Sequence, residues 1–245
     1  MKEMRFNGKV VIITGAGQGL GAAYAVDFAA EGASVVLVGR TESKLEKVAA
    51  GIQSAGGTAM VCPADIARED QVADLMEKVM VRFGTVDVLI NNAAAHKSVA
   101  LAETSKEDWD RQIDINLTGT FLCTRAVLPE MIKKRYGKIV NISSSAAKLF
   151  FPGFGAYSAS KAGIVGLTHT LSEEVKQHNI NVNALYLGMI NTENTRARMG
   201  KDPAVTSQLE EMLQVEEVSK VVLFFASDDS SAIMGAAVDV FGKKA

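Results

Sequence analysis

Two side chains that can move a proton together lie four residues apart in the second half of the chain. Tyr157 and Lys161 stand at the start of a segment with helical apolar spacing, so both project from one face of the expected helix. A phenol titrates near pH 10 unless a neighbouring charge favours the phenolate, as a nearby ammonium does. The pair predicts a phenol that exchanges protons near neutral pH, although the same spacing also fits an ordinary helix-surface contact.

A run of three serines precedes this pair. Ser144 lies thirteen residues before Tyr157 and just after segment 138–142, whose composition indicates a buried strand. In doubly wound sheets ligands bind beyond the carboxyl ends of strands, so the Ser144 hydroxyl could hold a substrate oxygen as negative charge develops on it. The residue types alone do not distinguish Ser144 from Ser143 and Ser145, because any of the three could simply cap the end of the strand.

A glycine-rich turn follows the first expected strand. The run Thr14-Gly15-Ala16-Gly17-Gln18-Gly19-Leu20-Gly21 has the spacing G-x-x-x-G-x-G and leads into a helical pattern. Glycines let the backbone turn sharply and approach a pyrophosphate, whose charge is attracted by the N–H groups at the helix start. The turn therefore predicts a dinucleotide site, with a merely tight strand-to-helix connection as the alternative.

The end of the second expected strand bears on the choice of cofactor. Dinucleotide sites often have an acidic residue there that holds the adenosine ribose hydroxyls, but this chain has Gly39 and Arg40. A carboxylate would repel a 2′-phosphate, whereas a guanidinium can pair with it through two parallel hydrogen bonds. Arg40 thus favours NADP(H), and NAD(H) stays possible if Arg40 is an ordinary surface arginine.

The elements that must position these residues alternate between short β-branched runs and longer amphipathic runs. The pattern predicts an α/β fold, a Rossmann-like doubly wound parallel sheet of seven strands with helices on both faces. The expected strands are 9–14, 34–38, 58–63, 86–91, 138–142, 180–187 and 236–240. The expected helices are 19–31, 43–55, 68–83, 109–135, 157–177 and 216–226.

Segment 191–213 interrupts the alternation with a mixture of Thr, Asn, Arg, Met and Gly. A long irregular segment after a strand is a plausible substrate lid in a doubly wound sheet. No repeat or linker divides residues 1–245, so we expect one dinucleotide-binding and catalytic domain.

The composition excludes several other classes of protein. The chain has 245 residues, of which 48% are hydrophobic and 22% charged, with a net charge of -2, so we expect no nucleic-acid partner. No apolar run is long enough to span a membrane and the first residues are charged, which predicts a cytoplasmic protein. Cys62 and Cys123 have no metal-ligand neighbours and are expected to be buried thiols, and no metal site is expected.

Together these residues resemble the short-chain dehydrogenase/reductases, in particular the 3-oxoacyl-carrier-protein reductase type, over essentially the whole chain. The matching pieces are the glycine turn, Asp65, Asn91-Asn92-Ala93, Asn116, Ser144 and the pair Tyr157 and Lys161. The resemblance implies an oxidoreductase that transfers a hydride between a nicotinamide cofactor and a small ketone or secondary alcohol. It also implies a homo-oligomer, either a tetramer or a dimer.

The resemblance further implies a role for each matching residue. The catalytic set is Asn116, Ser144, Tyr157 and Lys161. The cofactor-binding set is Gly15, Gln18, Gly19, Leu20, Gly21, Arg40, Asp65, Ile66, Asn92, Tyr157, Lys161, Ile190 and Thr192. In reduction, Ser144 would hold the carbonyl oxygen and Tyr157 would protonate it, while Lys161 binds the nicotinamide ribose and Asn116 holds a water that links Lys161 to solvent.

The chain departs from the family pattern at three positions. Ala94 replaces the last glycine of Asn-Asn-Ala-Gly, Leu187 replaces a proline, and Phe241 replaces an aspartate near the end. His96 lies in the loop after Asn92 and is expected to face solvent rather than the pocket.

Several functions fit these residues. The leading hypothesis is an NADP(H)-dependent reductase of a 3-oxoacyl thioester or a small cyclic ketone. The alternatives are an NAD(H)-dependent secondary-alcohol, sugar or steroid dehydrogenase and, because of the three departures, a weakly catalytic regulatory protein that binds a dinucleotide. The substrate itself cannot be read from the sequence.

Overall fold

Seven parallel strands form one sheet in the computed structural model, which describes residues 4–199 and 212–242. The order across the sheet is β3-β2-β1-β4-β5-β6-β7. The first three strands are therefore added in one direction from β1, and β4 to β7 are added in the other. The strands are β1 (Val10–Thr14), β2 (Ser34–Gly39), β3 (Thr58–Pro63), β4 (Val88–Asn91), β5 (Gly137–Ser144), β6 (Ile180–Leu187) and β7 (Ala237–Val240). This confirms the predicted α/β fold and the seven predicted strands, most of them with ends shifted by one or two residues.

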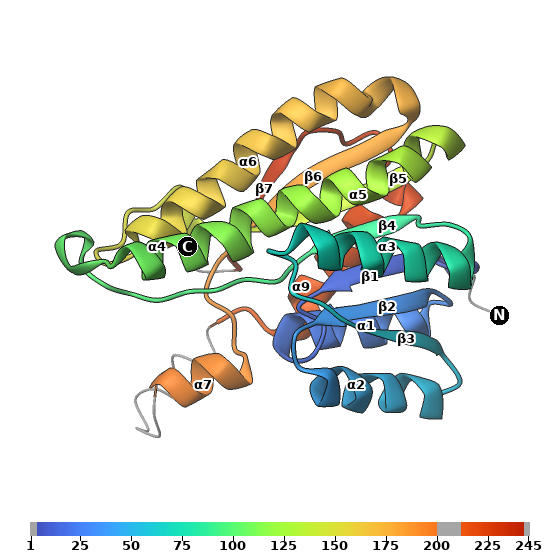
Figure 1. Cartoon of the computed structure of the whole chain (residues 1–245), viewed down its shortest axis with the longest axis horizontal. Coiled ribbons are helices and arrows are strands. Elements are labelled where there is room, and N and C mark those ends of the chain that lie inside the picture. Colours follow the sequence, from blue (N-terminus) through green and yellow to red (C-terminus); the bar gives the residue numbers. More distant parts are fainter. Residues whose placement is uncertain (1–3, 200–211, 243–245) are drawn as a thin grey trace.

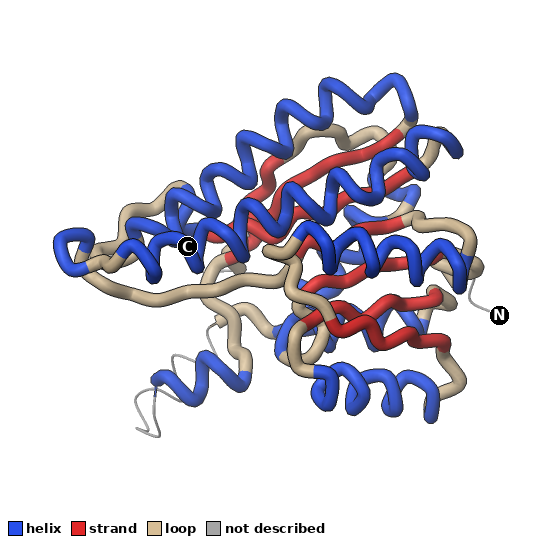
Figure 2. Tube along the Cα trace, viewed as in Figure 1, coloured by secondary structure: helices blue, strands red, loops and turns tan. Residues whose placement is uncertain are grey.

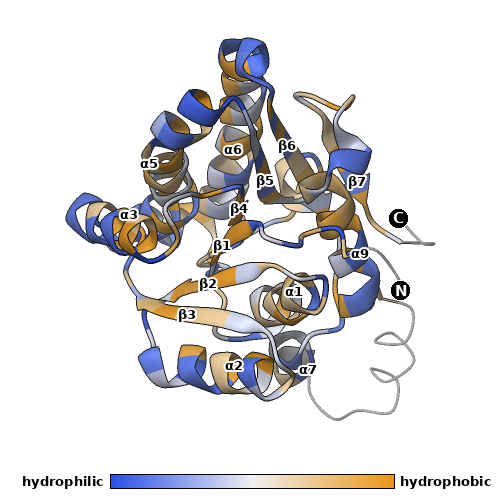
Figure 3. Cartoon of the chain, turned by 90° about the vertical axis from the view of Figure 1, so that its right-hand side faces the viewer, coloured by the Kyte–Doolittle hydropathy of each residue, from blue (hydrophilic) through white to orange (hydrophobic). Residues whose placement is uncertain are grey.

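Helices cover both faces of the sheet (Figures 1 and 3). Alternate side chains of β1 point to opposite faces, as the two-residue period of a strand requires. Val11 and Ile13 join a core with α1, α2 and α9, whereas Val10 and Ile12 join a second core with α3, α5 and α6. The helices are α1 (Gly19–Ala30), α2 (Glu42–Ser54), α3 (Glu69–Phe83), α4 (Lys106–Ile113), α5 (Gly119–Lys134), α6 (Gly155–Val175), α7 (Glu193–Met199) and α9 (Val215–Ala226).

The predicted helix 109–135 is not one regular helix. It starts earlier, as α4, and a π-helical segment, Asp114–Thr118, separates α4 from α5. A π segment inserts an extra residue into the turn and is common at functional sites. Apolar spacing did not reveal it because one inserted residue changes the helical period only locally.

Strand β5 runs two residues beyond its predicted end, to Ser144. The loops that follow β4, β5 and β6 all leave the same edge of the sheet, on the left in Figure 2, because the strands are parallel. Residues distant in sequence therefore meet at this carboxyl edge.

The segment expected to be irregular, 191–213, is in part helical. Helix α7 occupies Glu193–Met199, and Ile190 forms a bridge with Leu213. The rest of the expected lid, 200–211, lies outside the described residues.

Cys62 on β3 and Cys123 on α5 are both buried and unpaired. Among the described residues, none of the helices has the length and apolar character needed to cross a membrane.

Candidate active site

The glycine turn between β1 and α1 brings the backbone close to the end of β4. Gly15 has a φ of 69°, and a Cβ at this position would lie 2.9 Å from the Cα of Ala93. A Cβ at Gly21 would collide with the carbonyl oxygen of Gly15. Larger residues at these two positions would push the turn outward, so the glycines keep the floor of the cleft open where α1 begins.

Thr14 fastens this turn to the strand beside it. Its hydroxyl oxygen accepts hydrogen bonds from the backbone N–H groups of Asn92, at 2.9 Å, and Ala93, at 3.0 Å. The Asn92 side-chain amide in turn donates to the carbonyl oxygen of Thr14 at 2.9 Å. Two segments nearly eighty residues apart are thus joined beside the cleft, and the Asn92 side chain is held by the Thr14 carbonyl.

A cleft of about 560 Å³ runs from the glycine turn along the carboxyl edge of the sheet. Most of the residues predicted to bind the cofactor line it. They are Gly15, Gln18, Gly19, Leu20, Gly21, Arg40, Asp65, Ile66, Asn92, Tyr157 and Thr192. The remaining two, Lys161 and Ile190, line a smaller cavity next to it.

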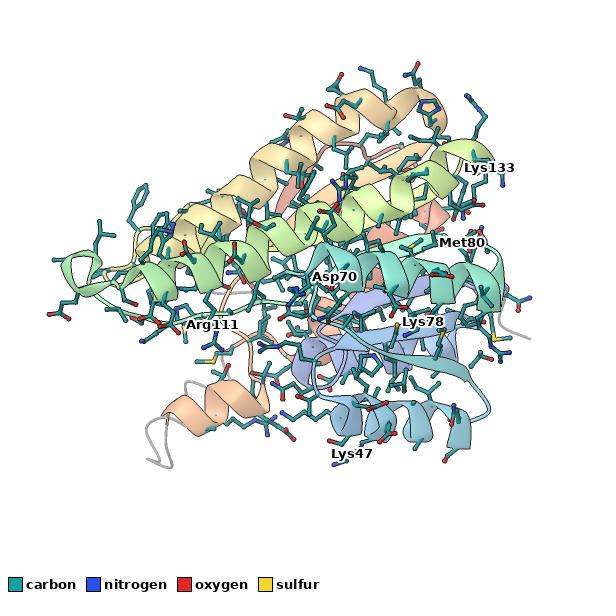
Figure 4. The ribbon with its side chains drawn as sticks, viewed as in Figure 1. Lys47, Asp70, Lys78, Met80, Arg111 and Lys133 are labelled. Atoms are coloured by element: carbon teal, nitrogen blue, oxygen red, sulfur yellow. The ribbon has the colours of Figure 1, made fainter. Side chains whose placement is uncertain are left out.

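Three residues that the sequence reasoning missed add charge or polarity to the cleft. Lys44 lines it from α2, and its Nζ donates to Gln18 Oε1 at 2.6 Å. Arg111 lines it from α4, on the side toward α7 (Figure 4). Thr195 lines it from α7. A basic residue four positions after Arg40 at the start of a helix was a signal for Lys44, whereas nothing near Arg111 in sequence marked it.

The charge of the cleft suits a polyanion. Among the described residues that line it, Arg40, Lys44 and Arg111 are basic and Asp65 alone carries a carboxylate. Cations gathered in a cleft with low-dielectric walls concentrate anionic ligands. The open glycine turn and these cations together fit the phosphates of a dinucleotide.

The proton-transfer residues meet in the second cavity, of about 180 Å³. Ser144, Tyr157 and Lys161 line it together, although they come from the end of β5 and from α6. The two cavities share Leu20, Asn92, Ala94 and Tyr157, so they adjoin. A ligand that fills the cleft therefore has its far end beside these three side chains.

Lys161 is buried without a carboxylate partner. The residue is only 2% exposed, and its Nζ donates to the carbonyl oxygen of Ile142 at 2.7 Å. Among the described residues, no ion pair involves it. Burial therefore lowers the pKa of Lys161 to about 8. The Nζ lies 5.7 Å from the centre of the Tyr157 ring, close enough for its charge to favour the phenolate.

The structure distinguishes the three serines. Ser143 is buried, and its hydroxyl donates to the carbonyl oxygen of Lys161 at 2.9 Å. Ser145 does not line either cavity. Ser144 lines the second cavity, where its Oγ accepts from the Ala146 N–H at 3.2 Å and keeps its own proton to donate. Ser143 lines the same cavity, but its proton is donated to the Lys161 carbonyl, so of the three serines Ser144 is the one whose hydroxyl can donate to a ligand there.

Asn116 connects the loop after β4 to the helix that carries Tyr157. It lies in the π segment, fully buried, and its Oδ1 accepts from the Ala95 N–H at 2.7 Å. Its Nδ2 donates to the Ala95 carbonyl oxygen and to Ser160 Oγ, both at 2.9 Å. The observed task of the side chain is thus to hold the wall of the site, and the expected water-binding role stays a prediction.

His96 is exposed, as expected, and lines neither cavity. Its ring also packs against two aromatic side chains, which was not expected. The ring centre lies 4.7 Å from that of Tyr157 and 4.5 Å from that of Phe154. The sequence reasoning missed this contact because the loop after β4 and the start of α6 meet only in three dimensions.

The three departures from the family pattern lie around the same cavities. Ala94 lines both cavities, and Leu187 and Gly188 line the second. Phe241 follows β7, and a Cβ on Gly188 would lie 3.2 Å from the Cα of Phe241. Each substitution adds bulk beside the site, but none removes a group that could transfer a proton.

Comparisons of the sequence with known proteins agree on one family. The family model described as short chain dehydrogenase matches residues 9–202. The chain is 38% identical over 242 residues to the 3-oxoacyl-[acyl-carrier-protein] reductase FabG of Thermotoga maritima, covering 98% of both chains. It is 36% identical over 243 residues to 3beta-hydroxysteroid dehydrogenase 1 of Eggerthella lenta, covering 96% of this chain and 93% of that one.

The fold is shared with a solved structure of similar length. NAD+-bound xylitol dehydrogenase superposes with a TM-score of 0.90 at 32% sequence identity. The match covers 97% of this chain and 99% of the other.

Proposed function

Because the chain belongs to the short-chain dehydrogenase/reductase family, whose oxidoreductases interconvert CH–OH groups and ketones with NAD(P), we propose that it does so through Tyr157, Lys161 and Ser144 with NADP(H) as the preferred cofactor. The observation that carries the proposal is the buried ammonium of Lys161, 5.7 Å from the Tyr157 ring and within the same cavity as Ser144. No catalytic residue expected from the family is missing.

The proposed division of labour follows from the chemistry of each group. Tyr157 gives its phenolic proton to the substrate oxygen in reduction and takes it back in oxidation. The Lys161 cation makes this possible near neutral pH because it stabilises the phenolate. Ser144 donates a hydrogen bond to the same oxygen while negative charge develops on it. A nicotinamide cofactor, when bound, supplies or accepts the hydride.

The cofactor would lie along the cleft. The glycine turn and the start of α1 would hold its pyrophosphate, and Asp65 and Ile66 would meet the adenine. Thr192 and Ile190 would hold the carboxamide end, and Lys161 the adjoining ribose. Helix α7, which contributes Thr195 to the cleft, supports the role of a lid for segment 191–213.

NADP(H) is favoured by the charge at the end of β2. Arg40 lines the cleft there, and no acidic residue occupies the position that would repel a 2′-phosphate. The relatives differ in this respect, since the superposed xylitol dehydrogenase holds NAD+. The choice therefore depends on this chain's own residues.

The substrate is proposed to be a ketone or a secondary alcohol. Relatives named as 3-oxoacyl-[acyl-carrier-protein] reductase and as 3beta-hydroxysteroid dehydrogenase support both a 3-oxoacyl thioester and a cyclic ketone as starting points.

A homo-oligomer, a dimer or a tetramer, is supported by the exposed apolar side chains Phe121 and Ile132 on α5, and light scattering measures it.

The decisive experiment follows NADPH absorbance with a panel of ketones. We expect turnover by the wild type and a loss of about a hundredfold to ten-thousandfold in Tyr157→Phe, because phenylalanine cannot donate the proton. Binding of NADPH, followed by fluorescence, should persist in the variant. If the wild type binds NADPH yet is as inactive as Tyr157→Phe on every ketone and alcohol, the protein is a dinucleotide-binding regulator instead.

The cofactor preference has its own test. In Arg40→Asp the affinity for NADPH should fall and that for NADH should not, because the new carboxylate repels only the 2′-phosphate. Arg82→Asp, at the end of α3, is the control for the change in net charge. An unchanged ratio of the two affinities in Arg40→Asp would remove Arg40 from the cofactor site.

A further inference from the structure

Large apolar side chains stand exposed on the loops that surround the second cavity. Phe150 and Phe151, on the loop after β5, are 97% and 44% exposed. Leu101, reached by the loop after β4, is 69% exposed, and Met189, after β6, is 60% exposed. Single exposed apolar residues are common. These four line neither cavity, but they stand on or next to the three loops whose inner residues line the second one, so they lie outward of it.

A series of ring contacts connects this exposed group to Tyr157. The ring centres of Phe151 and Phe154 lie 5.5 Å apart, and those of Phe154 and His96 4.5 Å apart. The His96 ring reaches the Tyr157 ring at 4.7 Å, in an edge-to-face arrangement. We call His96, Phe151 and Phe154 the aromatic wall. It runs from the proton-donating phenol outward to solvent.

The two loops that form the wall are fastened to each other. The backbone N–H of Val99 donates to the carbonyl oxygen of Gly153 at 2.9 Å. A side chain on Gly153, whose φ is 82°, would lie 2.7 Å from the Ser98 hydroxyl. The rings are therefore held in place before any ligand arrives, which reduces the entropy that binding would cost.

The wall offers little to an anionic group. Apart from His96, the charged residues of the stretches 93–100 and 145–154 are Lys97 and Lys148. Each has a carboxylate partner: Lys97 pairs with Asp108 at 2.6 Å and Lys148 with Asp239 at 2.7 Å. A phosphate or carboxylate on the substrate would therefore compete with these carboxylates for the two ammonium groups.

We propose that the aromatic wall binds an aryl or alicyclic ring next to the carbonyl of the substrate. The inference rests on the proposed function and deepens it, because it selects a ring-bearing ketone over a linear 3-oxoacyl thioester. A ring packed against Phe154 and Phe151 would gain offset or edge-to-face contacts, which short linear chains cannot make. In such a ketone the carbonyl carbon is bonded directly to the ring, and the inner members of the wall, His96 and Phe154, have ring centres 4.7 Å and 6.1 Å from that of Tyr157.

The test compares acetophenone and cyclohexyl methyl ketone with butan-2-one in NADPH-dependent reduction. The wild type should have the higher kcat/KM with the ring ketones. In Phe151→Ala the ratio of kcat/KM for acetophenone to that for butan-2-one should fall by about threefold to tenfold, the usual worth of an aromatic contact. Phe224→Ala is the control, because Phe224 is 36% exposed on α9 and packs against Phe225.

The ratio separates substrate binding from a structural effect. Phe154→Ala or His96→Ala could misplace Tyr157, which would lower the rates with all three ketones equally and leave the ratio unchanged. Should Phe151→Ala fail to fold, Phe151→Leu replaces it, because leucine keeps an apolar side chain at this position but has no ring. The ratio should fall in the same direction, by a smaller factor.

Three results would overturn the inference while the proposed function stands. The first is an active wild type whose ratio is left unchanged by Phe151→Ala and by Phe151→Leu. The second is an acetoacetyl thioester that the wild type reduces with a higher kcat/KM than every ring ketone. The third is a fall in oligomer mass with an unchanged ratio, which would make the wall a contact between subunits. Absence of turnover with any carbonyl would instead remove the proposed function itself.

Discussion

Two buried lysines at opposite edges of the sheet show how neighbours decide what an ammonium does. Lys138 stands near the amino end of β5, and Lys161 faces its carboxyl end. Both residues are 2% exposed. Lys138 contacts Asp228 at 3.3 Å and Asn181 at 2.9 Å, whereas the hydrogen bond of Lys161 within the described residues goes to the carbonyl oxygen of Ile142, with no carboxylate nearby.

The same burial therefore has different consequences. For Lys138, burial lowers the pKa and the Asp228 carboxylate partly offsets this by raising it. For Lys161 nothing opposes burial, and the pKa falls to about 8. A lysine near its titration midpoint in mild base, next to a phenol, is suited to proton transfer. A paired lysine is suited to holding strands together.

The amino edge extends this second role. The carboxylate of Asp87 contacts the Lys134 ammonium at 2.6 Å and accepts from the Val10 N–H at 2.8 Å. Tyr136 packs beneath the ammonium of Lys9, at 3.9 Å from the ring centre. These contacts join the starts of neighbouring strands, far from the proposed chemistry.

The largest expected difference between the two edges is in activity. Lys161→Met should lower kcat/KM by at least about a hundredfold, because the phenolate of Tyr157 loses its nearby cation. Lys138→Met, the matched control with equal burial, should keep wild-type activity even if it unfolds more easily. Steady-state kinetics at pH 7 measure both. If the folded Lys138→Met variant loses as much activity, the proposed division between the edges is wrong.

The second difference is in how stability depends on pH. The pKa of Lys161 is about 8 in the folded chain and 10.5 in the unfolded chain, so between these values the unfolded chain binds the extra proton. Stability therefore rises as the pH increases from 8 to 10.5, by about 3 kcal/mol, and this group contributes no slope below pH 8. Urea unfolding of the cofactor-free protein measures it. Lys161→Met should lack this rise, and an equal rise in both proteins would contradict the assignment.

The smallest expected effect is at the amino edge. Asp87→Asn should lower the free energy of unfolding by about 2 kcal/mol, since it weakens a largely buried ion pair and the acceptor of the Val10 N–H. The exposed pair of Asp74 and Lys78 is the control, and Asp74→Asn should cost at most about 0.5 kcal/mol. Urea denaturation compares the two variants. Equal losses, or reduced turnover by folded Asp87→Asn, would count against a purely structural role.

Much of the fold follows from local sequence. Short, nearly all-apolar β-branched runs predicted the seven strands, and longer amphipathic runs predicted most helices, because both patterns follow from which faces of an element are buried. The glycine turn was predictable because only glycine fits where Gly15 meets Ala93 and Gly21 meets Gly15. Helix ends and the π segment around Asn116 were not, since long-range packing adjusts them.

The sequence by itself determined the fold class, the family and the spacing of Tyr157 and Lys161 on one helical face, because each depends on residues close together in the chain. Only the tertiary structure decided that Ser143 donates its hydroxyl proton to the Lys161 carbonyl while Ser144 keeps its own for the cavity, that His96 packs on Tyr157, and that Arg111 reaches the cleft. It also decided that Lys161 is buried without a carboxylate. The physical reason is that burial and electrostatic neighbours are set by segments far apart in sequence, which meet only when the sheet assembles.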